Sequence, residues 1–270
     1  MARTAGITSA ANPLFQETRR AIVRGTLTEG GCCVAESFHL LEEALRSRCE
    51  VPAVLAAESA LSPAEAQVRG LPGVRVVSLP DRLFQSLAAT ETSQGVIALV
   101  KPPVWRLEQL FRDRPLVVVL DGVQDPGNAG AIARSAEAFG ATGIFFLKGS
   151  VSPFNAKTLR ASAGSLFRLP FLHGVETPEA LAACERHRLD LYAGVPPRIA
   201  RPDAPARAPA EVDLTRPCGF VTGSEAHGVS EEWLAAACGL TIPTAGVESL
   251  NAAVAAAILL YEARRQRGRP

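Results

Sequence analysis

The chain has 270 residues, of which 47% are hydrophobic and 20% charged, and its formal net charge is +1 at pH 7. This composition is typical of a globular protein with one large domain or two ordinary ones. No apolar stretch, residues 252–261 included, is long enough to span a bilayer as a helix, and residues 1–13 lack the apolar core of a secretion signal. We therefore expect a cytoplasmic protein. The small net charge neither requires nor excludes nucleic acid as a partner.

The cysteines indicate neither a metal site nor a disulfide framework. They form no Cys-x-x-Cys pair, and the chain has only 4 histidines. Zinc sites and disulfide-rich domains depend on spacings of these residues that this sequence lacks. We predict that no metal is bound and that the cysteines, at positions 32, 33, 49, 184, 218 and 238, are reduced structural thiols.

Residues 14–100 alternate between helical and strand-like patterns. Helices are predicted over residues 14–24, 37–47, 62–70 and 83–88, and strands over residues 32–35, 53–57, 74–78 and 95–100. Ser37 is suited to cap the second of these helices, because its hydroxyl can accept a hydrogen bond from a free backbone N–H. Alternating strands and helices imply a small α/β domain with a parallel or mixed sheet.

The pattern breaks at the Lys-Pro-Pro sequence of residues 101–103, where we place a domain boundary. We expect a first domain over residues 1–103, a linker with a short helical segment over residues 104–114, and a second α/β domain over residues 115–270. In the second domain, strands are predicted over residues 116–120, 143–147, 189–194, 218–222 and 240–242, and helices over residues 129–139, 155–165, 231–237 and 249–267. The Pro-, Ala- and Arg-rich residues 196–216 are expected to form an irregular connection.

Three stretches of the second domain carry polar residues suited to a binding site. Residues 120–140 read LDGVQDPGNAGAIARSAEAFG, residues 220–230 read FVTGSEAHGVS, and residues 242–262 read IPTAGVESLNAAVAAAILLYE. Each stretch contains or follows an apolar strand and then turns through Gly, Pro, Asn or Ser. Ligands in α/β proteins bind in loops of this kind, at the carboxyl ends of strands.

A dinucleotide site of the Rossmann type is disfavoured. Its signature is Gly-x-Gly-x-x-Gly between a strand and a helix, with an acidic residue near the end of the next strand. Here the loop reads DPGNAG, and Lys148 follows the next strand in place of an acidic residue. We therefore do not expect NAD to bind.

Taken one at a time, the polar residues of the three stretches have structural interpretations as well as functional ones. Arg134 lies off the apolar stripe of its helix, so it can project towards the loop or simply into solvent. Glu225 could be a helix cap or a surface carboxylate, and His227 is interpreted as a loop residue. Ser249 is placed to cap the C-terminal helix.

In this order, the three stretches resemble the motifs of the SpoU (TrmH-like) RNA 2′-O-ribose methyltransferases, which belong to the SPOUT superfamily. The resemblance implies an α/β fold whose C-terminal domain contains a deep trefoil knot, an exception to the usual avoidance of knots. It also implies S-adenosyl-L-methionine as the cofactor, RNA as the substrate, and a homodimer with the active site near the subunit interface. The helix over residues 249–267 favours a dimer, because its apolar surface is broader than one core-facing stripe requires. Burial within one subunit is the alternative.

The resemblance assigns roles to individual residues of the second domain. In the family the motif arginine is proposed to remove the proton from the ribose hydroxyl. A guanidinium is almost never deprotonated near neutral pH, so Arg134 could instead orient an RNA phosphate and stabilise the developing oxyanion. The loop before Ser249 is one residue shorter than the commoner form and has Thr244 where Met is frequent. The catalytic residues implied are Arg134, Asn128, Glu225, Ser249 and Asn251, and the cofactor-binding residues are Gly223, Ile242 and Leu250.

The first domain resembles the ribosomal-protein-like substrate-binding domain that precedes many SpoU catalytic domains. The resemblance lies in the sequences NPLFQETRRAI, LLEEALRS and SQGVIALV. It implies that Arg19, Arg20 and Arg24 contact RNA phosphates, although each could equally belong to a solvated basic face.

We therefore expect an S-adenosylmethionine-dependent RNA 2′-O-ribose methyltransferase, with rRNA favoured over tRNA as the substrate. Within the same fold, an antibiotic-resistance rRNA methyltransferase and a tRNA ribose methyltransferase are alternatives. A catalytically silent RNA-binding protein is a further alternative from a different class. It is disfavoured, because such a protein would be expected to lack Arg134 or Asn251, and both are present.

Overall fold

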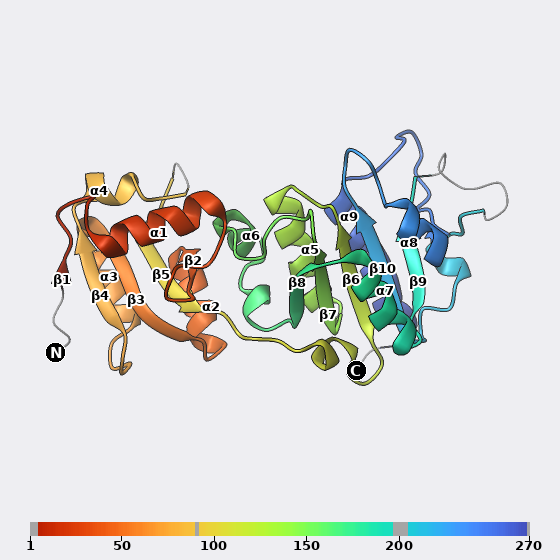
Figure 1. The fold of residues 1–270 in the computed structure, drawn as a ribbon, viewed down its shortest axis with the longest axis horizontal. Coiled ribbons are helices and arrows are strands. Elements are labelled where there is room, and N and C mark those ends of the chain that lie inside the picture. The colour runs from red at the N-terminus through yellow and green to blue at the C-terminus, as the bar shows by residue number, and fades with distance from the viewer. Residues whose placement is uncertain (1–4, 90–91, 197–204, 269–270) are drawn as a thin grey trace. The chain divides into compact units, whose positions relative to one another are not determined.

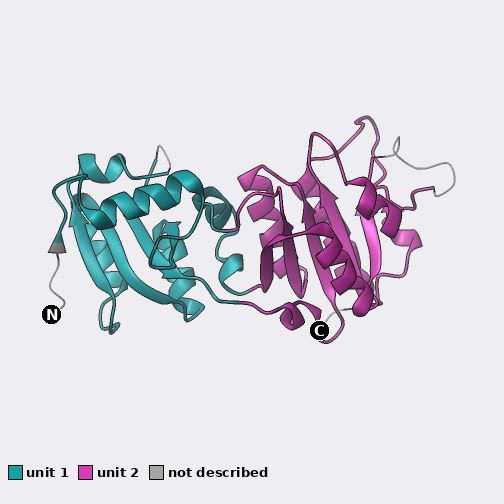
Figure 2. Ribbon diagram, in the orientation of Figure 1, with its two compact units in different colours: residues 1–104, 154–168 teal, residues 105–153, 169–270 magenta. Residues whose placement is uncertain are grey.

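The computed structural model describes residues 5–89, 92–196 and 205–268, and the chain divides into two compact units (Figure 2). Unit 1 consists of residues 1–104 and 154–168, and unit 2 of residues 105–153 and 169–270. The segment 154–168 therefore belongs to unit 1, although it follows two strands of unit 2 in the sequence. Part of the connection predicted over residues 196–216, namely residues 197–204, lies outside the described residues.

Unit 1 contains a mixed five-stranded sheet, as the alternating pattern predicted. The strand order is β1-β4-β3-β5-β2. β5 pairs antiparallel with β3 and β2, whereas β4 pairs parallel with β1 and β3. The strands are β1 (Ala5–Gly6), β2 (Cys33–Glu36), β3 (Glu50–Ala57), β4 (Arg75–Leu79) and β5 (Val96–Lys101). The helices are α1 (Pro13–Arg24), α2 (Phe38–Arg46), α3 (Leu61–Gln67), α4 (Asp81–Gln85) and α6 (Ala156–Ala161), with short 3₁₀ turns η1 (Glu58–Ala60) and η3 (Ser165–Phe167).

Capping residues determine where α1 begins and ends and where α2 begins. The side chain of Asn12 accepts hydrogen bonds from the first turn of α1, and Pro13 fixes the backbone of its first residue. The helix ends at Gly25, which has the left-handed backbone conformation (φ +63°) that glycine adopts without strain. Ser37 caps α2 as predicted, because its hydroxyl accepts from the backbone N–H of Leu40 at 3.1 Å.

Unit 2 contains a six-stranded sheet in which every strand pair is parallel (Figure 1). The strand order is β11-β9-β10-β6-β7-β8, so β10 lies between strands from the two halves of the unit. The strands are β6 (Leu116–Asp121), β7 (Gly143–Leu147), β8 (Phe171–Val175), β9 (Asp190–Gly194), β10 (Cys218–Gly223) and β11 (Cys238–Leu240). The helices are α5 (Pro126–Ala138), α7 (Thr177–Arg186), α8 (Glu231–Ala236) and α9 (Ala252–Gln266), with 3₁₀ turns η2 (Leu107–Phe111) and η5 (Pro209–Glu211).

Helices cover both faces of the unit 2 sheet, which explains the continuous apolar sequence of its central strands. α7 and α8 pack on one face, where Cys184 and Trp233 join a core with Val119 and Val221. α5 and α9 pack against each other on the other face. Burial raises the pKa of the Cys184 thiol to about 12, as expected for an unreactive structural thiol. Among the described residues, no helix is both long and apolar enough to cross a membrane.

Several predicted boundaries in unit 2 were wrong by a few residues. α5 begins at Pro126 rather than at residue 129, because Asp125 caps it and Pro126 is suited to the first helical turn. α9 begins at Ala252, and its cap is Asn251 rather than Ser249. Neither β8 nor α7 was predicted, since the sequence of β8, FLHGV, contains His and Gly and lacks a sustained apolar run.

Candidate active site

The site lies at the carboxyl ends of β9, β10 and β11, where a pocket of about 470 Å³ opens beside the start of α9. This volume is within the range of small-molecule sites. All three predicted cofactor-binding residues, Gly223, Ile242 and Leu250, line the pocket. Its lining also includes Glu225, His227, Ser249 and Asn251. The structure thus brings together residues from the second and third sequence motifs.

Asn128 connects the first motif to the other two through side-chain hydrogen bonds. The Asn251 Nδ2 group donates to Asn128 Oδ1 at 3.0 Å. The Asn128 Nδ2 group in turn donates to a carboxylate oxygen of Glu225. Asn251 Oδ1 is used to cap α9, where it accepts from the N–H groups of Ala253 and Val254 at 2.9 and 3.2 Å. Each amide is therefore fixed in orientation, because exchanging its oxygen and nitrogen would break hydrogen bonds on both sides.

Helices α5 and α9 run side by side in the same direction. Asn128 and Asn251 meet at their N-terminal ends, and the rings of Phe139 and Tyr261 meet edge to face, 5.8 Å apart, at their C-terminal ends. The positive N-terminal ends of both helices therefore lie near Glu225. This arrangement stabilises a negative charge there, whether it belongs to the carboxylate or to a reacting group.

The loop that carries Glu225 is shaped by backbone contacts. Ser224 and Gly228 exchange two backbone hydrogen bonds of 3.1 and 2.8 Å, and the Ser224 hydroxyl accepts from the His227 N–H at 3.1 Å. A Cβ atom on Gly223 would overlap the backbone of Gly228 and Val229, so only glycine fits at this position. The Asp121 carboxylate, at the end of β6, anchors the far side of the loop by accepting from the Ser230 N–H at 2.7 Å.

Sequence reasoning missed part of the pocket. Gly194, the last residue of β9, and Val195, which follows it, line the pocket, and so does Thr222 near the end of β10. The signal was present, since β9 ends in the same strand-then-glycine pattern as the second motif. His227 lies in a loop, as the sequence predicts, and this loop forms part of the pocket wall.

Arg134 does not contact the connected side chains of Asn251, Asn128 and Glu225. It is exposed on α5, does not line the pocket, and makes no hydrogen bond or ion pair through its side chain within the described part of the chain. It lies six residues after Asn128, which places the two side chains about 120° apart around the helix. A single copy of the chain therefore holds Asn128, Glu225, Ser249 and Asn251 at the site, without Arg134.

The predicted RNA-contacting arginines lie on α1 in unit 1, and all of them are exposed. The Arg20 guanidinium forms an ion pair with Glu29, with an N–O distance of 2.7 Å. No ion pair is found for Arg19 or Arg24 among the residues that the structure describes. These two side chains are available to bind an anion.

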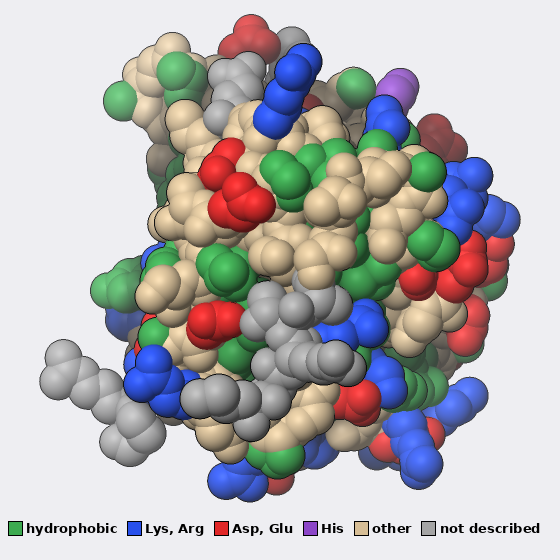
Figure 3. Space-filling view, turned by 90° about the vertical axis from the view of Figure 1, so that its left-hand side faces the viewer, with side chains coloured by type: hydrophobic (Ala, Val, Ile, Leu, Met, Phe, Trp, Pro, Cys, Tyr) green, Lys and Arg blue, Asp and Glu red, His purple; other side chains and the backbone are tan. Residues whose placement is uncertain are grey.

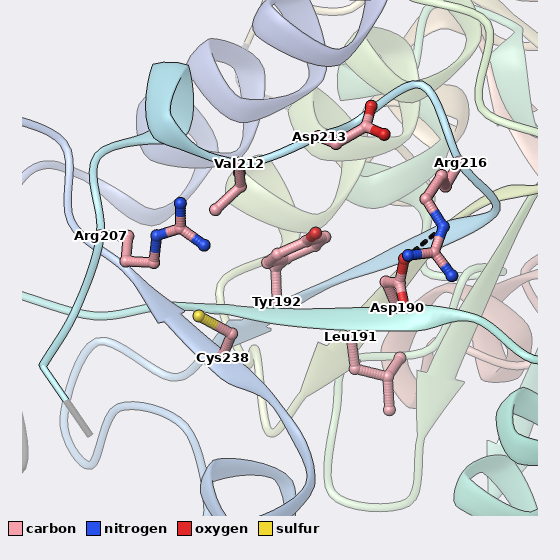
Figure 4. A pocket seen from close by; sticks show the side chains of 8 residues that line it. All are labelled: Asp190, Leu191, Tyr192, Arg207, Val212, Asp213, Arg216 and Cys238. Atoms are coloured by element: carbon pink, nitrogen blue, oxygen red, sulfur yellow. Dashed lines mark ion pairs between the residues drawn. The ribbon is translucent and has the colours of Figure 1, made fainter. Parts of the chain in front are cut away.

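A second pocket of about 350 Å³ lies beside the first residues of β9 and β11 (Figure 4). Arg216 pairs there with Asp190 at 3.3 Å. Burial, with a smaller contribution from the Asp190 charge, raises the pKa of Tyr192 to about 12. None of the residues from the three motifs lines this pocket, so the pocket at the carboxyl ends of the strands is the candidate active site.

The fold and pocket define an α/β protein that binds a small ligand at the carboxyl edge of a parallel sheet. Comparison with known proteins identifies the class. Residues 115–261 match the model of the SpoU rRNA Methylase family, and residues 26–98 match that of the MRM3-like substrate binding domain. The chain belongs to the SpoU rRNA methylase family.

Relatives and solved structures are similar over nearly the full length. An uncharacterized tRNA/rRNA methyltransferase of Synechocystis is 33% identical, over 97% of this chain and 94% of the relative. The 23S rRNA (guanosine(2553)-2′-O)-methyltransferase RlmP of Bacillus subtilis is 29% identical, over 96% of this chain and 98% of the relative. The crystal structure of an AdoMet-bound rRNA methyltransferase from Sinorhizobium meliloti has a TM-score of 0.80 and 26% identity, and covers 97% of this chain and 98% of that one.

Proposed function

We propose that the protein transfers the methyl group of S-adenosylmethionine to the 2′-oxygen of a ribose in ribosomal RNA. The observation that carries the proposal is the connected series Asn251–Asn128–Glu225, which links all three motifs at the mouth of the pocket. Its relatives named as rRNA 2′-O-methyltransferases support the same reaction and the same class of substrate.

The pocket residues fit S-adenosylmethionine. Ile242, Leu250 and Leu259 give the pocket apolar walls suited to an adenine ring and a methionine chain, and the loops after β9 and β10 present backbone polar groups. Glu225 and Glu248 add negative charge near a cationic ligand. When bound, the cofactor supplies an activated methyl carbon.

The remaining work of the enzyme is to hold the ribose hydroxyl in line and to help remove its proton. We propose that Asn128, Glu225, Ser249 and Asn251 position the substrate and the cofactor. Hydrogen bonds connect three of them, and Ser249 lines the pocket. We assign to Arg134 the stabilisation of the negative charge that develops on the ribose oxygen. A guanidinium is a strong hydrogen-bond donor and almost never a base, so we favour stabilisation of the oxyanion over removal of the proton as the role of Arg134.

We propose that a second copy of the chain completes the site. α9 exposes a stripe of large apolar side chains, Val254, Ile258 and Tyr261, which are 48%, 37% and 55% accessible. Their spacing of four and three residues places them on one face of the helix. An exposed apolar stripe on a helix that is already packed on its other side is typical of a subunit interface. Because α5 lies beside α9, a dimer formed through this layer would allow Arg134 of one subunit to approach the pocket of its partner.

The two parts of the chain would then divide the work. Residues 1–103 bind the RNA through Arg19, Arg20 and Arg24, and residues 104–114 form a linker. Residues 115–270, apart from the segment 154–168 that belongs to unit 1, carry out methyl transfer within a trefoil-knotted domain. We propose the cytoplasm as the place of action. A tRNA substrate is the less favoured alternative, because the relatives that support this proposal most directly are named for rRNA.

Two measurements on the full chain test the proposal. Calorimetric titration should detect binding of S-adenosylmethionine and none of NAD. NAD binding without S-adenosylmethionine binding would contradict the cofactor assignment. Transfer of a tritiated methyl group should then be seen with a 23S rRNA transcript, and incorporation into tRNA alone would contradict the substrate class.

A further inference from the structure

Two helices that are distant in sequence, α1 and α6, meet in unit 1, and each carries exposed cations near the meeting point. A Cβ atom on Gly25, the residue after α1, would lie 3.0 Å from Asn155 Nδ2 and 3.6 Å from Asn155 Cα. Asn155 is the residue that caps α6, so the end of α1 meets the start of α6. Arg24 is the last residue of α1, and Lys157 and Arg160 lie on α6. Figure 1 shows α6 beside the C-terminal end of α1.

α6 is held so that both of its cations face outwards. Its side chain cap, Asn155, accepts from the N–H groups of Lys157 and Thr158 at 2.9 and 3.4 Å. Thr158 and Leu159 are buried, with 0% and 2% of their surface accessible. Lys157 and Arg160 are exposed and three residues apart, which places them on one face of the helix. The burial of the opposite face fixes the direction in which the two charges point.

These cations are not neutralised by neighbouring carboxylates. Within the described residues, no ion pair is found for Arg24, Lys157 or Arg160. Three other arginines of unit 1 are compensated: Arg20 by Glu29, Arg46 by Glu42, and Arg168 by Glu43. On the face of the molecule seen in Figure 3, Lys and Arg side chains are likewise interspersed with Asp and Glu side chains. The α1–α6 junction therefore carries uncompensated positive charge that two different helices contribute.

We propose that Lys157 and Arg160 bind the phosphate backbone of the substrate RNA, on a surface that they form together with Arg24. The inference rests on the proposed function for the identity of the partner. Phosphate binding needs positive charge held in place rather than a specific hydrogen-bond pattern, and two cations one turn apart on an anchored helix meet that need. The RNA-binding surface of unit 1 is thus composite, because α6 comes from the stretch of sequence between β7 and β8 of unit 2.

The test is a charge reversal of both α6 residues in the full chain. The Lys157→Glu/Arg160→Glu variant should bind a 23S rRNA transcript at least about tenfold more weakly at near-physiological salt. The slope of log affinity against log salt concentration should fall in magnitude by about two, one for each lost phosphate contact. Affinity for S-adenosylmethionine and the thermal unfolding midpoint should not change, because both side chains are exposed and lie outside unit 2.

The matched control is the Arg69→Glu/Arg75→Glu variant, which reverses two other exposed cations of unit 1 for which no ion pair is found in the described chain. This control changes the net charge equally, so it should lose markedly less affinity and keep the salt slope. Equal losses in the two variants would show that only total charge matters and would overturn the proposal. An α6 variant that binds and methylates rRNA like the wild type would also overturn it while leaving the proposed function intact. A wild-type protein that binds no rRNA would overturn both.

Discussion

The side chain of Asn251 donates a hydrogen bond of 3.0 Å to the side chain of Asn128, which lies 123 residues earlier in the chain. Asn251 also caps α9, and Asn128 also holds Glu225. One residue pair therefore connects the start of a long helix to the carboxylate at the mouth of the pocket. The same contact serves the stability of α9 and the geometry of the site, and a suitable substitution can separate the two.

Asn251→Asp should separate them. An aspartate keeps an oxygen that caps α9, and Asn and Asp are nearly equal as caps, so the thermal unfolding midpoint should be close to that of the wild type. Its carboxylate cannot donate to Asn128 and adds a negative charge near Glu225. Methyl transfer to rRNA should therefore fall by about tenfold or more, a loss comparable to that of one positioned hydrogen bond to a charged network. A variant that is stable and fully active would show that the Asn251–Asn128 bond has no role in catalysis.

Arg134→Ala should reduce methyl transfer by roughly a hundredfold or more, the range seen when a group that acts on the proton or the developing charge is removed. S-adenosylmethionine binding should be retained, because Arg134 does not line the pocket. The matched control is Arg112→Ala, which removes another exposed arginine of unit 2 and should leave turnover unchanged. An Arg134→Ala enzyme with most of its turnover would identify Arg134 as a surface residue.

Mixing the two impaired variants, Asn251→Asp and Arg134→Ala, tests whether Arg134 acts on its own subunit or on its partner. A mixed dimer contains one Arg134→Ala chain and one Asn251→Asp chain. If each site takes its arginine from the partner, one of the two sites combines an intact Asn251 with an intact Arg134. If each site is built within one subunit, neither site combines the two. Recovered activity on mixing is the result expected from the proposed dimer, and mixtures that stay as inactive as the separate variants would contradict it.

The sequence pattern predicted which residues would lie close together better than it predicted the helix boundaries around them. Gly223, Glu225, Ile242, Leu250 and Asn251 all line one pocket, because they lie at or after the carboxyl ends of β10 and β11, and parallel strands end at one edge of the sheet. Ser249 was predicted to cap α9, yet the helix begins two residues later. Capping strength alone could not decide this, since Ser and Asn are equally good caps. The hydrogen bond from Asn251 to Asn128, which depends on the tertiary fold, favours the later start.

Other features of the fold depend on long-range contacts that no local pattern encodes. The segment 154–168 joins unit 1 through contacts such as the 2.6 Å ion pair between Arg168 and Glu43, which are 125 residues apart. Likewise, the distance of Arg134 from the other site residues could not be deduced from its place after the first motif. The spacing of residues along α5 shows on which side of the helix Arg134 lies. It does not reveal what that side of the helix contacts.

Gly223→Ala should abolish cofactor binding and lower the thermal unfolding midpoint, because its Cβ would overlap the backbone of Gly228 and Val229. Backbone atoms on both sides of the loop would have to move, and the loop carries Glu225. The matched control is Gly246→Ala in the third motif, where an added Cβ meets no atom within 4 Å. This control should remain stable and bind S-adenosylmethionine. Normal titration of Gly223→Ala with the cofactor would contradict the close approach described here.

Ile258→Lys should convert the proposed dimer to a monomer, because it places a charge in the centre of the exposed stripe on α9. Light scattering of the full chain at micromolar concentration measures this directly. Val23→Lys provides the control, since Val23 is 78% exposed but lies on α1 of unit 1. We expect it to leave the mass unchanged. A monodisperse wild-type monomer, active without self-association, would exclude the dimer.

The most direct test of the central claim is the position of the transferred methyl group. rRNA is methylated in vitro with the purified chain and then hydrolysed by alkali, which cleaves RNA only where the 2′-hydroxyl is free. We predict that treatment with the wild type makes one linkage of the rRNA resistant to alkali and that treatment with Arg134→Ala does not. In rRNA from cells that lack the gene, the same linkage should be cleaved. A methyl group found on a base, or no protected linkage at all, would contradict the assignment as a ribose 2′-O-methyltransferase.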